Sequence, residues 1–128
     1  INRSANTLSA SEIQRIRIAN QILVPLSDVL YVFDEPSIGL HPSENLRMIH
    51  HFKTLVNRGN TVIVVEHDLE TIANADHIID IGPQAGTNGG EILFNGSLND
   101  FKNHNKLKGV SPTFDALYGN ENNKTTIP

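Results

Sequence analysis

Charged residues follow two apolar runs of the sequence. Asp34-Glu35 comes directly after the run 29–33, and Glu66-His67-Asp68 follows the run 61–65. An Asp at the end of a buried strand can orient Mg²⁺ beside a nucleotide, and an adjacent Glu can polarise the attacking water. Ligands of parallel α/β sheets bind beyond the carboxyl ends of the strands. If the two strands are neighbours, these groups converge into a nucleotide-hydrolysis site; the alternative is that acidic residues simply follow strands in solvated loops.

The elements that must position these groups alternate between helices and strands. The runs 29–33 and 61–65 are continuous and rich in strand-forming residues, which predicts two strands buried on both faces. Two more strands are predicted over His77–Ile81 and Gly90–Gly96. This alternation predicts an α/β fold with a mainly parallel sheet flanked by helices.

Helices are expected before and between the strands. Ser9-Ala10-Ser11-Glu12 has the form of a capping box and predicts the start of the first helix. The second helix would be capped by Ser43 and end at Gly59, and a short third helix is predicted over Leu69–Ala75. Apolar residues at helical spacing predict the buried faces of the first two helices. These positions are Ile13, Ile16, Ala19 and Leu23 in the first helix, and Leu46, Ile49, Phe52 and Val56 in the second.

Composition limits the kinds of site that the chain can form. The 128 residues include no Cys, which rules out disulfides, thiolate zinc sites and a Cys nucleophile within them. No apolar run is long enough to span a membrane. The net charge of −4 argues against a main nucleic-acid contact surface. The sequence begins with Ile1 and its single Met is Met48, so we interpret it as a segment of a longer protein or a processed product.

Several stretches resemble motifs of the ATP-binding-cassette (ABC) ATPases. Residues 8–12 with Gln14-Arg15 resemble the signature motif, residues 29–35 the Walker B strand, and residues 37–41 the D-loop, while His67 occupies the position of the switch histidine. Longer phrases, among them Asp34-Glu35-Pro36-Ser37-Ile38-Gly39-Leu40-His41, resemble the UvrA family of bacterial excinuclease subunits. The resemblance covers Arg3 to Phe101 and implies a partial P-loop NTPase fold, in the C-terminal part of the first nucleotide-binding half.

The same resemblance implies roles for individual residues. Asp34 would hold Mg²⁺ through water, Glu35 would activate the attacking water, and His67 would contact the γ-phosphate of ATP. Ser9 would act on the nucleotide bound by the opposing half. The implied catalytic residues are Glu35 and His67, and the implied nucleotide-binding residues are Ser9, Ala10, Ser11, Glu12, Asp34, Ser37 and Gly39.

Cofactors, partners and cellular location also come from the resemblance. It implies ATP and Mg²⁺ as cofactors, with zinc in the parent protein but outside this segment. The implied partners are an opposing nucleotide-binding half in the same chain or in a dimer, DNA, and a UvrB-like repair subunit, with no membrane. The parent would be a cytoplasmic ATPase that recognises damaged DNA in nucleotide excision repair and the SOS response.

Two departures from the family pattern keep other functions open. Ala10-Ser11 stands where the family usually has Gly-Gly, and a Cβ hinders close approach of the backbone to phosphate. No Gly-x-x-x-x-Gly-Lys-Ser/Thr phosphate loop (Walker A) occurs, so the isolated chain is expected to be inactive. The alternatives are an ABC-type transport or drug-resistance ATPase and a non-catalytic interaction fragment. We assign residues 1–102 to the nucleotide-binding domain and 103–128 to a tail or linker, with one short helix over 113–118.

Overall fold

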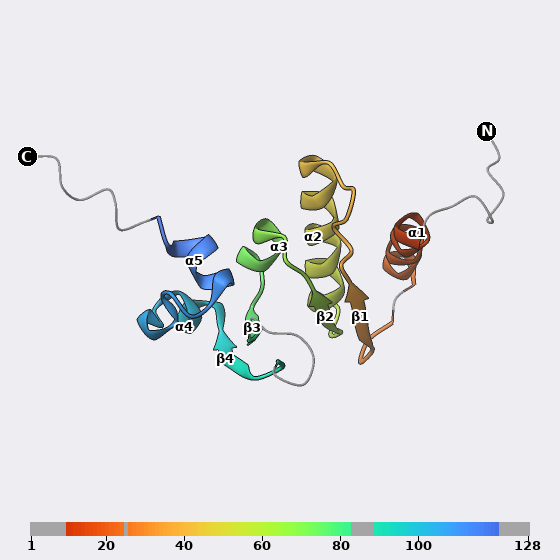
Figure 1. Cartoon of the computed structure of the whole chain (residues 1–128). Helices are drawn as coiled ribbons and strands as arrows, with labels where there is room; N and C mark the ends of the chain where they lie inside the picture. The colour runs from red at the N-terminus through yellow and green to blue at the C-terminus, as the bar shows by residue number, and fades with distance from the viewer. Residues whose placement is uncertain (1–9, 25, 83–88, 121–128) are drawn as a thin grey trace, which may run out of the picture. The chain divides into compact units, whose positions relative to one another are not determined.

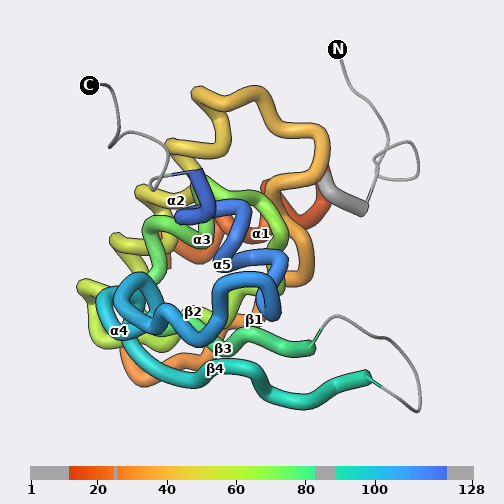
Figure 2. The backbone as a smooth tube through the Cα atoms, turned by 60° about the vertical axis from the view of Figure 1, so that its left-hand side comes forward, coloured from red at the N-terminus to blue at the C-terminus, as the bar shows by residue number. Residues whose placement is uncertain are grey.

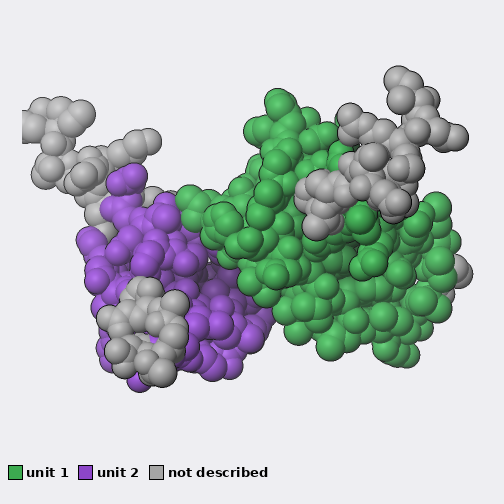
Figure 3. Space-filling model, turned by 45° about the vertical axis from the view of Figure 1, so that its right-hand side comes forward, with its two compact units in different colours: residues 1–71 green, residues 72–128 purple. Residues whose placement is uncertain are grey.

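The computed structural model describes residues 10–24, 26–82 and 89–120. Helices and strands alternate over residues 10–81, and a further strand and three short helices follow (Figure 1), which confirms the predicted α/β class. The chain divides into two compact units, residues 1–71 and residues 72–128 (Figure 3). The elements are α1 (Ala10–Leu23), β1 (Leu30–Asp34), α2 (Pro42–Asn57), β2 (Thr61–Val65), α3 (Leu69–Ala73), β3 (His77–Ile81), β4 (Ile92–Ser97), α4 (Leu98–Lys102), the 3₁₀ helix η3 (Asn105–Leu107) and α5 (Pro112–Tyr118).

Unit 1 is built on the parallel pair β1 and β2. Their register runs from Leu30 opposite Thr61 to Asp34 opposite Val65. One face of the pair packs against residues of α1 and α2, and the rings of Phe33 and Phe52 stack with their centroids 4.9 Å apart. The buried core of this unit consists of Ile18, Tyr31, Phe33, Met48, Phe52 and Leu55.

Asn60 fixes the start of both strands. Its side-chain oxygen accepts a hydrogen bond from the Val29 amide at 3.1 Å, and its side-chain nitrogen donates to the carbonyls of Leu26 and Leu55, both at 2.9 Å. Asn60 is 6% exposed, so its side-chain amide has little access to water. These three bonds provide it with hydrogen-bond partners inside the protein. Because Asn60 ties the segment before β1 to the segment before β2, the two strands begin level with each other.

The second face of β1 and β2 is exposed, which corrects our expectation of strands buried on both faces. Burial alternates along both strands, and α1 and α2 contribute core residues on one side only. Four of the exposed side chains are apolar: Leu30 and Val32 on β1, and Ile63 and Val65 on β2. Among the residues that the structure describes, these continuous apolar runs therefore form strands that are buried on one face only.

The buried face of α1 differs from the predicted one. All four predicted positions (Ile13, Ile16, Ala19 and Leu23) are exposed, whereas Ile18 is 3% exposed and Ile22 packs against the same core. Helix α1 carries apolar residues on two faces, and the sheet contacts only the face of Ile18 and Ile22. Periodicity alone could not distinguish the two faces.

Helix α2 begins two residues earlier than a Ser43 cap would allow. Its N-cap is His41, whose ring accepts a bond from the Ser43 amide, and the Glu44 carboxylate accepts a bond from the His41 amide at 2.9 Å. The predicted burial of Ile49 and Phe52 is confirmed. The predicted burial of Leu46 and Val56 is wrong, since both are exposed; Asn45, Met48 and Leu55 complete the inner face instead.

Unit 2 contains the antiparallel pair β3 and β4, which run side by side in Figure 2. Strand β3 matches its predicted bounds, and β4 begins at Ile92 rather than Gly90. Its core gathers Ile78, Phe101, Leu107 and Phe114. Leu107 and Phe114 belong to the segment 103–128 that the sequence assigns to a tail, so η3 and α5 of this segment pack into the core. The functional boundary at residue 102 stays a prediction. Residues 121–128 lie outside the described residues.

We predict that Phe101→Ala destabilises unit 2 by about 3–5 kcal/mol. Phe101 is fully buried, and its ring meets those of Phe94, Phe114 and Tyr118. Hydrogen exchange of the β3, β4 and α5 amides would measure the loss. Lys106→Ala, at an exposed position, is the control and should change stability by less than about 0.5 kcal/mol; equal effects of the two variants would contradict the assigned core.

Candidate active site

The parallel register brings the two charged strand ends together. The Glu35 amide donates a hydrogen bond to the Val65 carbonyl at 2.8 Å, which extends the pairing by one residue beyond β1. The chain after β2 then places Nδ1 of His67 3.4 Å from Oε1 of Glu35. A carboxylate and an imidazole therefore meet at the carboxyl edge of the sheet, where ligands of α/β folds bind.

Glu35 adopts a backbone conformation that residues other than glycine seldom adopt. Its φ is +46°, in the left-handed region that usually favours glycine. Residues held in such conformations concentrate at functional sites, where the surrounding structure maintains them. The side chains of Glu35 and His67 are 46% and 75% exposed, so both are accessible to a ligand.

Glu66 holds the loops on both sides of the pair. Its Oε1 accepts a hydrogen bond from the Ser37 amide at 2.8 Å, and its Oε2 accepts from the amides of His67 and Asp68 at 3.1 and 3.2 Å. The sequence places Glu66 among the charged residues after a strand, but Glu66 is not one of the predicted site residues. Its position beside His67 was the signal that the sequence offered.

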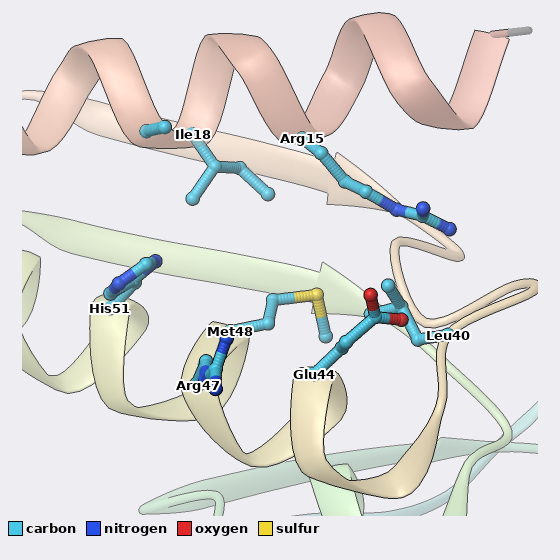
Figure 4. Close-up of a pocket in the computed structure, with 8 residues that line it drawn as sticks. Arg15, Ile18, Leu40, Glu44, Arg47, Met48 and His51 are labelled. Atoms are coloured by element: carbon cyan, nitrogen blue, oxygen red, sulfur yellow. The ribbon is translucent and has the colours of Figure 1, made fainter.

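Arg15 holds the same loop from α1. Its Nη2 donates to the Ile38 carbonyl at 3.0 Å, and Figure 4 shows the side chain extending from α1 toward the loop after β1. Its Nε is buried without a hydrogen-bond partner among the described residues. Gly39 has φ +72°, and a Cβ there would lie 3.7 Å from Nη2 of Arg15. The guanidinium was not among the predicted site residues, although Arg15 stands within the signature phrase.

Asp68 anchors the start of α3. Its Oδ2 accepts from the Thr71 amide at 2.8 Å, the Thr71 hydroxyl at 2.7 Å and the Asn45 side-chain nitrogen at 2.9 Å. Burial by itself raises the pKa of the Asp68 carboxyl, but the hydrogen bonds from Thr71 and Asn45 outweigh it and hold the pKa below its ordinary value. The loop that carries His67 is thus attached to α2 as well as to α3.

A hollow of about 150 Å³ lies between α1 and α2, and Arg15 and Leu40 are among the residues that line it. Figure 4 shows Ile18 of α1 and Met48 of α2 projecting into it, with Glu44 and Leu40 near one end. His51 lines the hollow, and burial, followed by the neighbouring His50, lowers the pKa of its imidazole. Its lining includes neither the Glu35 carboxylate nor the His67 imidazole, so it is a separate feature from the strand-end site.

The predicted site residues differ in how far the structure describes them. Glu35 and His67 lie together, and Ser37 joins them through the Glu66 carboxylate. Asp34 is the exposed last residue of β1. Glu12 lies in the first turn of α1. Ser9 lies outside the described residues, as do the side chains of Ala10 and Ser11.

Asp34 suits Mg²⁺ only as part of a larger ligand set. The described residues contain no group of three or more His, Asp or Glu side chains that could hold a metal ion by themselves. Mg²⁺ in nucleotide sites commonly keeps several waters and takes one or two carboxylates together with substrate phosphates. The exposed carboxylate of Asp34 fits that manner of binding.

Comparisons with known proteins give one consistent similarity. No protein-family model matches the chain. The chain is 54% identical over 128 residues to UvrABC system protein A of Helicobacter pylori, covering 100% of the chain and 13% of that protein. It is 54% identical over 111 residues to the Thermus thermophilus protein of the same name, covering 86% of the chain and 12% of the relative. The crystal structure of UvrA2 from Deinococcus radiodurans matches with a TM-score of 0.81 and 42% identity, over 98% of this chain and 15% of that one.

We predict that the stability contributed by Asp68 disappears in acid. Because the pKa of Asp68 is lowered on folding, its contribution is complete above the ordinary value of 3.8 and is lost as the pH falls through the lower folded value. Asp68→Asn keeps an acceptor oxygen but cannot titrate, so wild type should lose stability relative to this variant only in acid. Urea unfolding at a series of pH values measures the difference; a difference independent of pH would contradict the prediction.

Proposed function

We propose that this chain, which matches UvrA proteins along its whole length, is part of an ATP-hydrolysing, damage-recognising subunit of bacterial nucleotide excision repair. The observation that carries the proposal is the pairing of the Glu35 carboxylate with the His67 imidazole, 3.4 Å apart at the carboxyl edge of a parallel sheet. The left-handed backbone of Glu35 is further support, since strain of this kind accompanies function.

Each residue of the pair has a distinct part in the proposed reaction. Bound Mg²⁺ would neutralise charge on the phosphates. Asp34, one residue before Glu35, would hold the metal through water. Glu35 accepts a hydrogen bond from the attacking water and takes up its proton. His67 turns Nδ1 toward Glu35, which leaves Nε2 on the other side of the ring to contact a γ-phosphate oxygen.

The chain spans about an eighth of the length of the curated UvrA proteins it matches. The exposed apolar face of β1 and β2 supports a place within a larger nucleotide-binding domain, in which further chain covers that face. The phosphate loop would then lie elsewhere in the parent, and Ser9, Ser37 and Gly39 would face the nucleotide of the opposing half. DNA, a UvrB-like subunit and a cytoplasmic location belong to the same proposal.

A UvrA-like resistance paralogue is the second candidate. The observation that favours it is Ala10-Ser11, because side chains at these positions hinder the approach of the signature backbone to a phosphate. The two candidates differ in the process that ATP hydrolysis serves, damage repair or drug resistance.

We predict that Glu35→Gln in the full-length protein that contains this chain lowers ATP hydrolysis about 10²–10⁴-fold. The amide keeps the shape and one acceptor oxygen but cannot take up a proton, so ATP binding should remain close to wild type. Single-turnover hydrolysis beside equilibrium ATP binding measures both quantities. The second nucleotide site must be disabled in the wild type and in each variant, so that its ATP turnover does not mask the loss of hydrolysis.

Asp34→Asn is the comparison variant for this experiment. It should weaken nucleotide binding in the presence of Mg²⁺, because it alters the metal site rather than the base. A single-turnover rate for Glu35→Gln within about twofold of wild type, equivalent to a few tenths of a kcal/mol, would exclude Glu35 as the base and indicate a site that no longer performs hydrolysis.

We predict that the isolated 128-residue chain does not bind Mg-ATP tightly. It contains no Gly-Lys pair and hence no phosphate loop, the element that supplies most phosphate contacts in this class. Isothermal titration calorimetry of the purified chain with Mg-ATP should detect no binding in the low-micromolar range. Low-micromolar affinity would mean that the residues of this chain form a phosphate site unaided.

A further inference from the structure

We propose that Glu66 is a positioning residue, whose carboxylate couples the loop after β1 to the loop after β2 and so sets the geometry of Glu35 and His67. Arg15 holds the first of these loops from the side of α1. The inference rests on the proposed function, because the pair that Glu66 positions is the pair assigned to ATP hydrolysis. Glu66 itself contacts neither the water nor the phosphate in this scheme.

The two oxygens of Glu66 are divided between the two loops. Oε1 takes the Ser37 amide at 2.8 Å, and Oε2 takes the amides of His67 and Asp68. Hydrogen bonds from backbone amides to an ionised carboxylate are stronger than hydrogen bonds between neutral groups. A single half-buried side chain therefore ties the backbone beside one proposed catalytic residue to the backbone of the other.

The loop after β1 is a tight turn that transmits the position of Ser37 to Glu35. The Ile38 amide donates to the Glu35 carbonyl at 3.4 Å, and the Leu40 amide donates to the Ser37 carbonyl at 3.0 Å. Between Glu35 and Ser37 the chain has only Pro36, which is buried and has a restricted φ. Displacing the Ser37 amide would therefore reorient the carboxylate of Glu35.

Arg15 fixes the same turn from the opposite direction. Its guanidinium binds the carbonyl of Ile38, the residue next to Ser37. Glu66 thus holds an N–H of the turn while Arg15 holds a C=O, and each side chain contacts the backbone of Ser37–Ile38 rather than another side chain. This arrangement links α1, the proposed signature helix, to the His67 loop through one turn.

Glu66→Gln separates the two loops with the least change of shape. Gln offers one acceptor oxygen and one NH₂ group, and an NH₂ group cannot accept from an amide. Either the Ser37 bond or the bonds to His67 and Asp68 must be lost. We expect kcat of the full-length protein to fall about 10–100-fold, as for other displacements of catalytic groups by about 1 Å, while the Kd for ATP stays within about twofold.

Glu44→Gln is the matched control. The Glu44 carboxylate also accepts a backbone amide, that of His41, but at a capping box where Gln serves as well as Glu. This variant should leave kcat and the Kd within about twofold of wild type. Glu35→Gln, measured in parallel, tests the proposed function itself. If Glu35→Gln abolishes hydrolysis while Glu66→Gln keeps kcat within about twofold, the coupling role of Glu66 is overturned and the proposed function stands.

Hydrogen exchange of the full-length protein tests the coupling without relying on hydrolysis. Glu66→Gln should accelerate exchange about tenfold or more in peptides spanning Pro36–Leu40 or His67–Leu69, whereas peptides from β1 and α2 should exchange as in wild type. Unchanged exchange in both loops would overturn the proposal. Faster exchange throughout β1, β2 and α2 would also overturn it, because Glu66 would then maintain the fold rather than these two loops.

Discussion

The hydrogen bond from the Glu35 amide to the Val65 carbonyl is the contact on which the site depends. It continues the β1–β2 register one residue past the end of β1. The first residue after β1 is therefore fixed against Val65, the last residue of β2. Asn60 fixes the opposite end of the same register. A slip of one residue would move Phe33 to the exposed face and carry Glu35 away from His67.

Hydrogen bonds between side chains and backbone groups hold much of the two loops beyond this register. The Glu66 carboxylate accepts hydrogen bonds from amides of both loops, the Arg15 guanidinium donates to a carbonyl, and the Asp68 carboxylate accepts from the Thr71 amide of α3. Such bonds keep the polar groups of two partly buried turns satisfied where no regular secondary structure can do so. These bonds hold the two loops in place, while Glu35 and His67 stay accessible.

The sequence predicted those parts of the fold that local patterns determine. β2 and β3 matched their predicted bounds, because each is a short run of strand formers between polar residues. The buried face of α1 was wrong, because its isoleucines occur on two faces and only contact with the sheet selects Ile18. The convergence of the strand ends followed from the expected parallel pairing. The sequence did not predict the roles of Glu66 and Arg15, because their hydrogen-bond partners are backbone groups that composition and spacing do not reveal.

The most direct test of the proposed site is a crystal structure of the full-length protein with Mg²⁺ and a non-hydrolysable ATP analogue. The terminal phosphate should lie at the carboxyl edge of β1 and β2, with Nε2 of His67 about 2.7–3.2 Å from a phosphate oxygen and the Asp34 carboxylate facing the metal or one of its waters. An analogue whose phosphates bind away from this edge, with neither Glu35 nor His67 near them, would contradict the assignment of the site.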